Sequence, residues 1–113
     1  MNHITISGNL GADPELRYTK NGRPLTTLSV ATTRKVKDEN ETVWHHVECW
    51  AELAENCAAT LVKGTRVIVI GRMDKQEFTT TSGEQRTKTL IVANEVAVSL
   101  IHQNVSVERN VRA

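Results

Sequence analysis

The chain has 113 residues, 39% of them hydrophobic, which is enough for one buried core but not for two. Fourteen basic and thirteen acidic residues give a formal net charge of +1, so bulk charge argues neither for nor against a polyanionic partner, and any nucleic-acid site must come from local clustering. No apolar run approaches the roughly 20 residues that span a bilayer, and residues 1–10 lack a signal-peptide pattern. These features predict a single-domain cytoplasmic protein without membrane contact.

The first third of the chain has the pattern of strands joined by turns. Apolar residues alternate with polar ones over residues 4–10, which predicts a strand weakened or bulged at Gly8. A turn at Asp13-Pro14 and an extended stretch over residues 15–19 follow. The pair Asn21-Gly22 predicts a two-residue hairpin turn, because such turns need positive φ. Residues 25–33, rich in Thr, Leu and Val, form the returning strand.

Residues 34–41 show no periodicity and are expected to form an exposed loop, basic in its first half and acidic in its second. The central strand, residues 42–50, alternates so that Trp44, His46, Glu48 and Trp50 share one face. Two indoles therefore project from one side. A helical pattern over residues 51–63 follows directly and stops at Gly64.

Residues 66–78 predict the longest strand, and its centre is apolar on both faces, as in a closed barrel or at a subunit contact. If Val67 and Val69 point into the barrel, Ile68 and Ile70 are exposed on its outer surface. Either a partner subunit or DNA bases could then cover them, and the sequence does not choose between the two. After a loop at 79–84, a last strand runs over residues 85–93 and on, unevenly, to residue 100. Five strands joined as antiparallel hairpins, with one short helix between the third and fourth, predict an all-β Greek-key barrel of the oligonucleotide-binding type.

Several segments of the chain resemble the bacterial single-stranded DNA-binding proteins. The resemblance covers roughly residues 2 to 100, and the order and spacing of its motifs make it specific. The matching motifs are Asn9-Leu10-Gly11-Ala12-Asp13-Pro14-Glu15-Leu16-Arg17-Tyr18, Asn21-Gly22, Trp44-His45-His46-Val47, Leu53-Ala54-Glu55, Leu61-Val62-Lys63-Gly64, Val67-Ile68-Val69-Ile70-Gly71-Arg72-Met73 and Ser82-Gly83-Glu84-Gln85-Arg86-Thr87. The resemblance implies an OB-fold single-stranded DNA-binding domain over residues 1–101 and a short C-terminal extension over residues 102–113.

This resemblance also implies a function and a site. The family is expected to bind single-stranded DNA without strong sequence preference, as a homotetramer built as a dimer of dimers, in DNA replication, recombination and repair. Trp44, Trp50 and Phe78 fall where the family places base-stacking aromatics. The alternative for the two tryptophans is a role in the core. The phosphate contacts are expected from basic residues that flank the binding strands and loops, namely Arg34, Lys35, Lys37, Arg72, Lys75, Arg86 and Lys88.

Three features depart from the family pattern. Val36 stands where relatives often carry a further Trp, which predicts one stacked base fewer, and Asp74 places a carboxylate where a basic residue is expected. The chain shows neither a Gly-, Pro- or Gln-rich linker nor an acidic tip, so recruitment of replication and repair enzymes through such a tail does not carry over. The chain is therefore expected to be either truncated or a tailless relative with a narrower role, such as protecting incoming or plasmid DNA.

Other functional classes find little support in the residues. The candidates for a metal or catalytic site are His45 and His46 near Glu48 and Cys49, but neighbouring residues on a strand point to opposite faces. The spacing of Cys49 and Cys57 fits no metal or redox motif and predicts two reduced core thiols. No enzyme activity, metal or cofactor is expected. A primosomal replication-accessory dimer and a protein-interaction barrel remain as alternatives.

Overall fold

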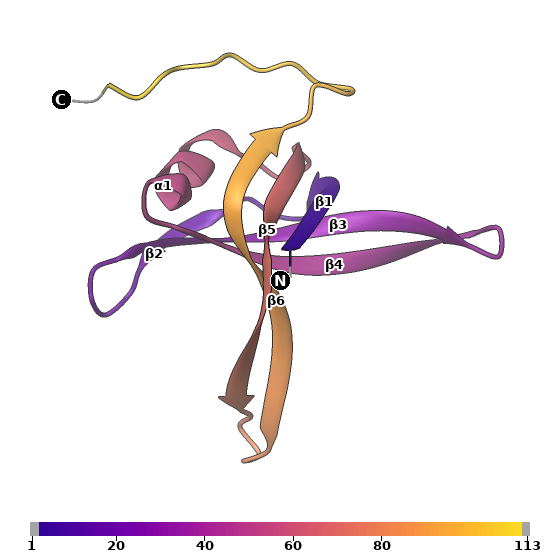
Figure 1. Ribbon diagram of the computed structural model, residues 1–113, viewed down its shortest axis with the longest axis vertical. Coiled ribbons are helices and arrows are strands. Elements are labelled where there is room, and N and C mark those ends of the chain that lie inside the picture. The colour runs from indigo at the N-terminus through magenta and orange to yellow at the C-terminus, as the bar shows by residue number, and fades with distance from the viewer. Residues whose placement is uncertain (1–2, 112–113) are drawn as a thin grey trace.

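The computed structural model describes residues 3–111, which form six strands and one helix (Figure 1). In chain order the elements are β1 (His3–Leu10), β2 (Glu15–Tyr18), β3 (Pro24–Val36), β4 (Glu39–Trp50), α1 (Ala51–Thr60), β5 (Arg66–Thr79) and β6 (Gln85–Val98). One sheet runs in the order β1-β5-β6-β4-β3-β2, and an additional β1–β3 pairing closes its first five strands into a barrel. The predicted all-β oligonucleotide-binding barrel is confirmed, and β2 lies outside it as a short strand on β3.

The barrel closes through two short pairings of strands that are distant in sequence. β1 meets β3 at Leu10↔Val30, and β4 meets β6 at Val47↔Ile91. The β4–β6 pairing is parallel, whereas hairpin joins alone predicted antiparallel strands. α1 lies between the third and fourth barrel strands, as predicted.

The core fills the barrel from alternate residues of its strands. Val67 and Val69 are fully buried, which is the condition under which Ile68 and Ile70 were expected to be exposed. These two isoleucines lie on the other side of β5, where they are half-buried rather than fully exposed. α1 covers one end of the barrel, and the buried Thr26 hydroxyl donates a 2.7 Å hydrogen bond to the Ala54 carbonyl of that helix.

The helix ends earlier than predicted. Its last residue is Thr60 rather than Lys63, because Leu61 turns to an extended backbone and buries its side chain in the core. Burying a leucine side chain stabilises by about 1.5–3 kcal/mol, which favours the extended backbone at this residue.

The expectation of a loop over residues 34–41 is wrong. β3 and β4 stay paired out to Val36↔Glu39, and Lys37 and Asp38 form a two-residue turn with φ of 48° and 66°. Both values are positive, as in a type I′ hairpin turn. The paired segment projects from the barrel into solvent (Figure 1). An arm with water on both faces has no hydrophobic alternation, which is why its sequence resembles a loop.

The hairpin at Asn21-Gly22 forms, but its turn is longer than predicted. The Gly22 N–H donates to the Thr19 carbonyl at 2.8 Å, and the Thr19 N–H donates to the Arg23 carbonyl. Gly22 has a φ of 78°, whereas Asn21 keeps negative φ. The loop is therefore three residues long, with a turn followed by a left-handed glycine. At Gly8, β1 pairs with β5 without a register shift, so no bulge forms there.

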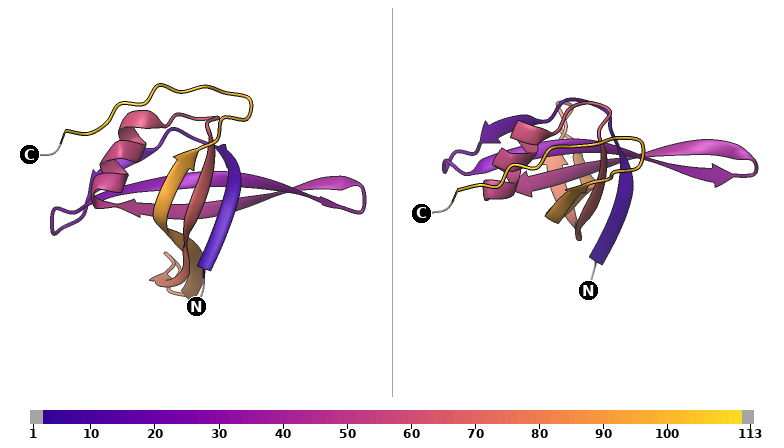
Figure 2. Two further views of the ribbon diagram at one scale, coloured as in Figure 1. Left: turned by 45° about the horizontal axis from the view of Figure 1, so that its top comes forward. Right: turned by 90° about the horizontal axis from the view of Figure 1, so that it is seen from above.

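The β5–β6 hairpin forms a second arm, and the C-terminal segment crosses the opposite side of the barrel (Figure 2). β6 contains a register shift opposite Ile70/Gly71, which fits the uneven strand expected there. Residues 99–111 form neither helix nor strand, and Asn110 reaches Glu52 and Asn56 on α1. In the described part of the chain, no helix has the length and apolar character needed to cross a membrane.

Candidate nucleic-acid interface

One outer surface of the barrel, here called the Trp44 face, carries the even-numbered side chains of β4. Trp44 is 61% exposed, and His46, Glu48 and Trp50 on the same face are half-buried, whereas Val47 and Cys49 point into the core. The parity predicted for the two tryptophans is confirmed. On β3, Ala31 lies directly opposite Trp44 and so shares its face.

Trp50 differs from Trp44 in having a cationic neighbour. It is the last residue of β4 and the residue that precedes α1. The Arg23 guanidinium carbon lies 4.6 Å from the ring centroid, within the range of a cation–π contact. One face of this indole is therefore covered by a guanidinium, which itself stacks on bases and pairs with phosphates.

Phe78 lies on the β5–β6 arm with 42% of its surface exposed. Register places it opposite Arg86, on the same side of the arm as Arg72 and Lys88. Glu48 on β4 pairs with Val92 on β6, and Val92 pairs with Arg72 on β5. The outer face of the arm is thus continuous with the Trp44 face.

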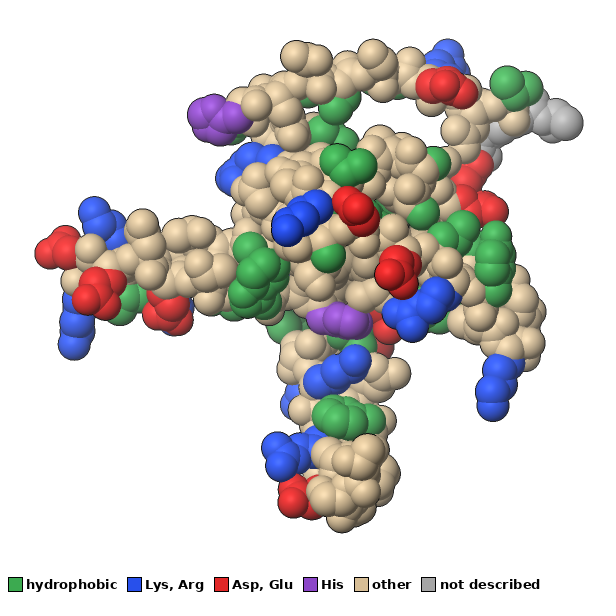
Figure 3. Space-filling model, turned by 180° about the vertical axis from the view of Figure 1, so that it is seen from behind, with side chains coloured by type: hydrophobic (Ala, Val, Ile, Leu, Met, Phe, Trp, Pro, Cys, Tyr) green, Lys and Arg blue, Asp and Glu red, His purple; other side chains and the backbone are tan. Residues whose placement is uncertain are grey.

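Strand register divides the predicted phosphate-binding residues into two groups. Lys35, Arg72, Arg86 and Lys88 lie on the Trp44 face. Arg34 and Lys75 lie on the opposite faces of the two arms, and Lys37 lies in the β3–β4 turn. Figure 3 shows Lys and Arg side chains on both arms and on the body between them, interspersed with acidic ones.

Two of these arginines have acidic partners. Arg34 forms a 3.0 Å ion pair with Glu41 across the β3–β4 arm, and Arg86 forms a 2.9 Å ion pair with Glu84. Both pairs are exposed, so each contributes little and can exchange its carboxylate for a phosphate.

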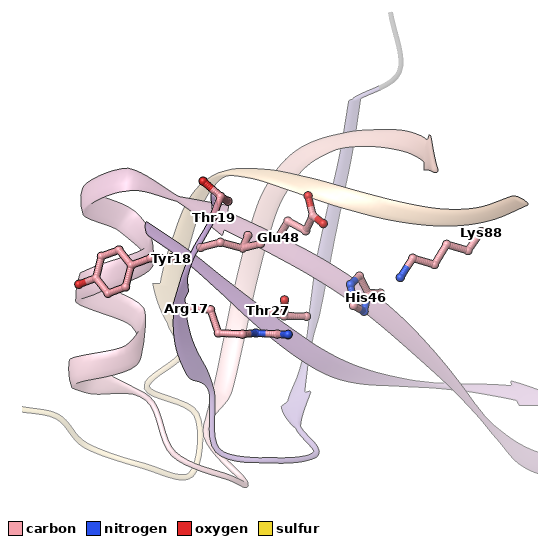
Figure 4. A pocket seen from close by; sticks show the side chains of 8 residues that line it. Arg17, Tyr18, Thr19, Thr27, His46, Glu48 and Lys88 are labelled. Atoms are coloured by element: carbon pink, nitrogen blue, oxygen red, sulfur yellow. The ribbon is translucent and has the colours of Figure 1, made fainter. Parts of the chain in front are cut away.

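A hollow of about 290 Å³ opens on the Trp44 face between β2, β3, β4 and β6. Its lining residues are Arg17, Tyr18, Thr19, Leu25, Thr27, His46, Glu48 and Lys88. Figure 4 shows the guanidinium of Arg17 and the ammonium of Lys88 directed toward the His46 imidazole, while the Tyr18 ring points away. The hollow therefore gathers three groups suited to an anion, with one carboxylate beside them.

The electrostatics of this hollow act on His46. Burial lowers the pKa of His46 below its ordinary value of 6.5, and Lys88 and Arg17 lower it further, against the opposing effect of Glu48. The imidazole is therefore neutral near pH 7 in the free protein, and a nearby phosphate would favour its protonated form.

The model of the single-strand binding protein family matches residues 1–99. The chain belongs to this family. Similar relatives named single-stranded DNA-binding protein come from Paenarthrobacter aurescens, 39% identical over 96% of this chain and 68% of that protein, and from Mycobacterium leprae, 38% identical over 97% and 70%. A relative from Mycolicibacterium smegmatis is 38% identical over 97% of this chain and 71% of its own length.

Sequence reasoning missed several residues of this family member's outer face. Arg17 stands in a motif of the resemblance, and His46 shares its parity with Trp44 and was considered as a metal or catalytic candidate, but neither was predicted to contact DNA. Tyr18, 62% exposed at the rim of the hollow, was also missed. The signal for His46 was present in the strand alternation, whereas Arg17 joins the hollow only through β2–β3 pairing at Arg17↔Leu25.

The residues that depart from the family pattern have defined places. Val36 lies at the tip of the β3–β4 arm, on the side opposite the Trp44 face, and is exposed. Asp74 has the parity of Arg72 and Phe78, and its carboxylate accepts a hydrogen bond from the backbone N–H of Lys75 at 2.8 Å.

The residues considered for metal binding or thiol chemistry make other contacts in the structure. His45 and His46 point to opposite faces, and His45 Nε2 lies 2.9 Å from the Thr32 hydroxyl. Across residues 3–111, no three metal-ligating side chains cluster. Cys49 and Cys57 are buried free thiols with sulfurs 4.0 Å apart. The contact with Cys57 and burial both raise the pKa of Cys49, so this thiol stays protonated and unreactive.

Proposed function

We propose that this protein binds single-stranded DNA without strong sequence preference, by stacking bases on aromatic side chains and contacting phosphates with basic ones. The observation that carries the proposal is Trp44, an indole 61% exposed on an outer barrel face that also bears Phe78 and a group of cations. An aromatic ring stacks on any base, which makes such binding tolerant of sequence.

Each aromatic has a defined part in this proposal. Trp44 stacks a base on the barrel body, Trp50 stacks one together with Arg23, and Phe78 stacks one on the β5–β6 arm. Stacking contributes on the order of 1 to 3 kcal/mol per base. Replacing Trp44 or Phe78 with Ala should weaken binding to all base compositions alike.

The phosphates are contacted by the cations that share this surface. They are Arg17, Lys35, Arg72, Arg86 and Lys88. Lys37 lies in the β3–β4 turn and belongs to neither face. Arg34 and Lys75 project from the faces of the two arms opposite the Trp44 face, which argues against their contacting the same strand of DNA. If about four of these cations each neutralise a phosphate, the slope of log affinity against log salt is near −3, at roughly −0.7 per contact.

The biological action follows from selective binding of the unpaired state. A protein that binds only single strands shifts hairpins and fraying duplexes toward open strands by mass action, without nucleotide hydrolysis. Such binding serves DNA replication, recombination and repair in the bacterial cytoplasm, at the nucleoid. We propose that the protein assembles as a homotetramer, built as a dimer of dimers, in which the half-buried Ile68 and Ile70 of β5 lie at a contact between subunits.

A tryptophan fluorescence titration with oligodeoxythymidine, repeated at several salt concentrations, tests the binding proposal. Strong quenching with a negative salt slope is expected. Absence of both would leave the indoles as protein-contact residues and favour an interaction barrel. Sedimentation equilibrium tests the assembly separately: four chains are expected, and two would favour the primosomal type of dimer.

A further inference from the structure

Gly11 follows β1 directly, on a backbone that is held from two sides. The Gly11 N–H donates to the Ser29 carbonyl of β3 at 2.9 Å. The preceding residue, Leu10, bonds through its N–H to the Thr65 carbonyl and accepts from the Gly64 N–H, both at 2.9 Å. The backbone at this point therefore has little freedom to move away from a neighbour.

The neighbour of Gly11 is the Trp44 indole. A Cβ atom built on Gly11 would lie 2.6 Å from Cη2 of Trp44 and closer still to Cζ3, distances that real Cβ contacts do not reach. By contrast, a Cβ on Gly8 or Gly71 would first meet backbone atoms of another strand. The indole of Trp44 thus occupies the space that a side chain at Gly11 would need.

A glycine can be required at a position by its backbone conformation or by a neighbour that leaves no space for a side chain. The φ of Gly11 is not in the left-handed region, so its backbone accepts an L-amino acid. The atoms that an alanine would strike are the outer end of a side chain, which can rotate, and not the fold itself. Glycine is therefore required at position 11 by the position of the indole.

We propose that Gly11 is a positioning residue for the stacking of DNA bases on Trp44. Its missing side chain lets the indole rest against the backbone that follows β1, with 61% of the residue still exposed. A ring held in one orientation loses less conformational entropy when a base stacks on it than a freely rotating ring does. The proposal rests on the proposed function, because it concerns the same aromatic platform.

The test is a double-mutant cycle measured by titration with a short oligodeoxythymidine. The variants are Gly11→Ala, Trp44→Ala and their combination, followed by Trp44→Phe with and without Gly11→Ala. Gly11→Ala should weaken binding about three- to tenfold, part of the loss on removing one stacked ring. In the Trp44→Ala background the same change should have no effect, since there is no ring to displace.

Trp44→Phe provides the rescue. A phenyl ring lacks the outermost indole atoms that an alanine at position 11 would strike. Gly11→Ala should therefore weaken binding in the wild type but not in the Trp44→Phe background. A purely structural role for Gly11 would give the same loss in every background, together with a lowered melting temperature, which circular dichroism records.

The outcomes separate the two proposals. If Trp44→Ala weakens binding and Gly11→Ala does not, the positioning role is refuted while stacking on Trp44 stands. An equal loss from Gly11→Ala with and without the indole also refutes positioning. If Trp44→Ala leaves affinity unchanged, the stacking proposal itself fails, and the positioning role fails with it.

Discussion

Lys88 and Lys75 provide a matched pair for testing which face meets the phosphate backbone. They lie on adjacent strands of the β5–β6 arm, where Lys88 pairs with Gln76 and Lys75 pairs with Thr89. The two side chains therefore project from opposite sides of the same arm. Lys88 also lines the hollow beside His46, whereas Lys75 does not. Changing either lysine to Gln removes the same charge.

The size of the effect follows from counterion release. Each phosphate contact to a single strand contributes roughly 0.7 to the slope of log affinity against log salt. Lys88→Gln should therefore change the slope from about −3 to about −2. The loss of affinity is about fivefold in 0.1 M salt, and the titration curves converge with those of the wild type near 1 M.

Fluorescence titrations with one oligodeoxythymidine at four salt concentrations measure this slope for the wild type and both variants. Lys75→Gln should leave the slope unchanged. An equal change of slope in the two variants would refute the assignment of the Trp44 face as the DNA surface. A salt-independent loss in Lys88→Gln would show that the lysine supports the hollow without contacting phosphate.

Three further outcomes are expected. Folding lowers the pKa of His46 below 6.5, so its protonation opposes folding, while the charged imidazole favours phosphate binding. As the pH falls below 6.5, the wild type should therefore lose stability and gain DNA affinity relative to the His46→Gln variant. Thermal melts measure the stability, and titrations measure the affinity. Thr26→Val removes the buried hydrogen bond to α1 and should lower the free energy of unfolding by about 1 kcal/mol in urea, with DNA affinity unchanged. Gly22→Ala should lower the free energy of unfolding by about 1 kcal/mol, because Gly22 has positive φ. Asn21→Ala should change the free energy of unfolding by less than about 0.5 kcal/mol. Equal losses in the two variants would contradict the three-residue turn.

The β3–β4 arm shows where sequence reasoning reached its limit. The turn at Lys37-Asp38 has none of the usual Asn-Gly pattern, and the strands that it joins are solvated on both sides. Their pairing depends on backbone hydrogen bonds, which leave no hydrophobic alternation in the sequence. The central strand was predicted correctly for the opposite reason, because one of its sides is buried and the other is not.

The basic residues proposed to contact phosphates show the same limit at the level of the site. Arg34 and Lys75 are basic and close to the binding strands in sequence, so composition could not separate them from Lys35 and Lys88. Register separates them, because a residue's side of a hairpin depends on its parity relative to a strand anchored in the core.

The sequence by itself determined the barrel class, the position of the helix and the shared face of Trp44 and Trp50, since each rests on a local period of two or of 3.6 residues. Only the tertiary structure decided the parallel closure of β4 on β6, the hollow that joins Arg17 to Lys88, and the contact of Gly11 with Trp44. These features bring together residues from strands far apart in the chain. No local period encodes such distances, because they are set by how the strands close around the common core.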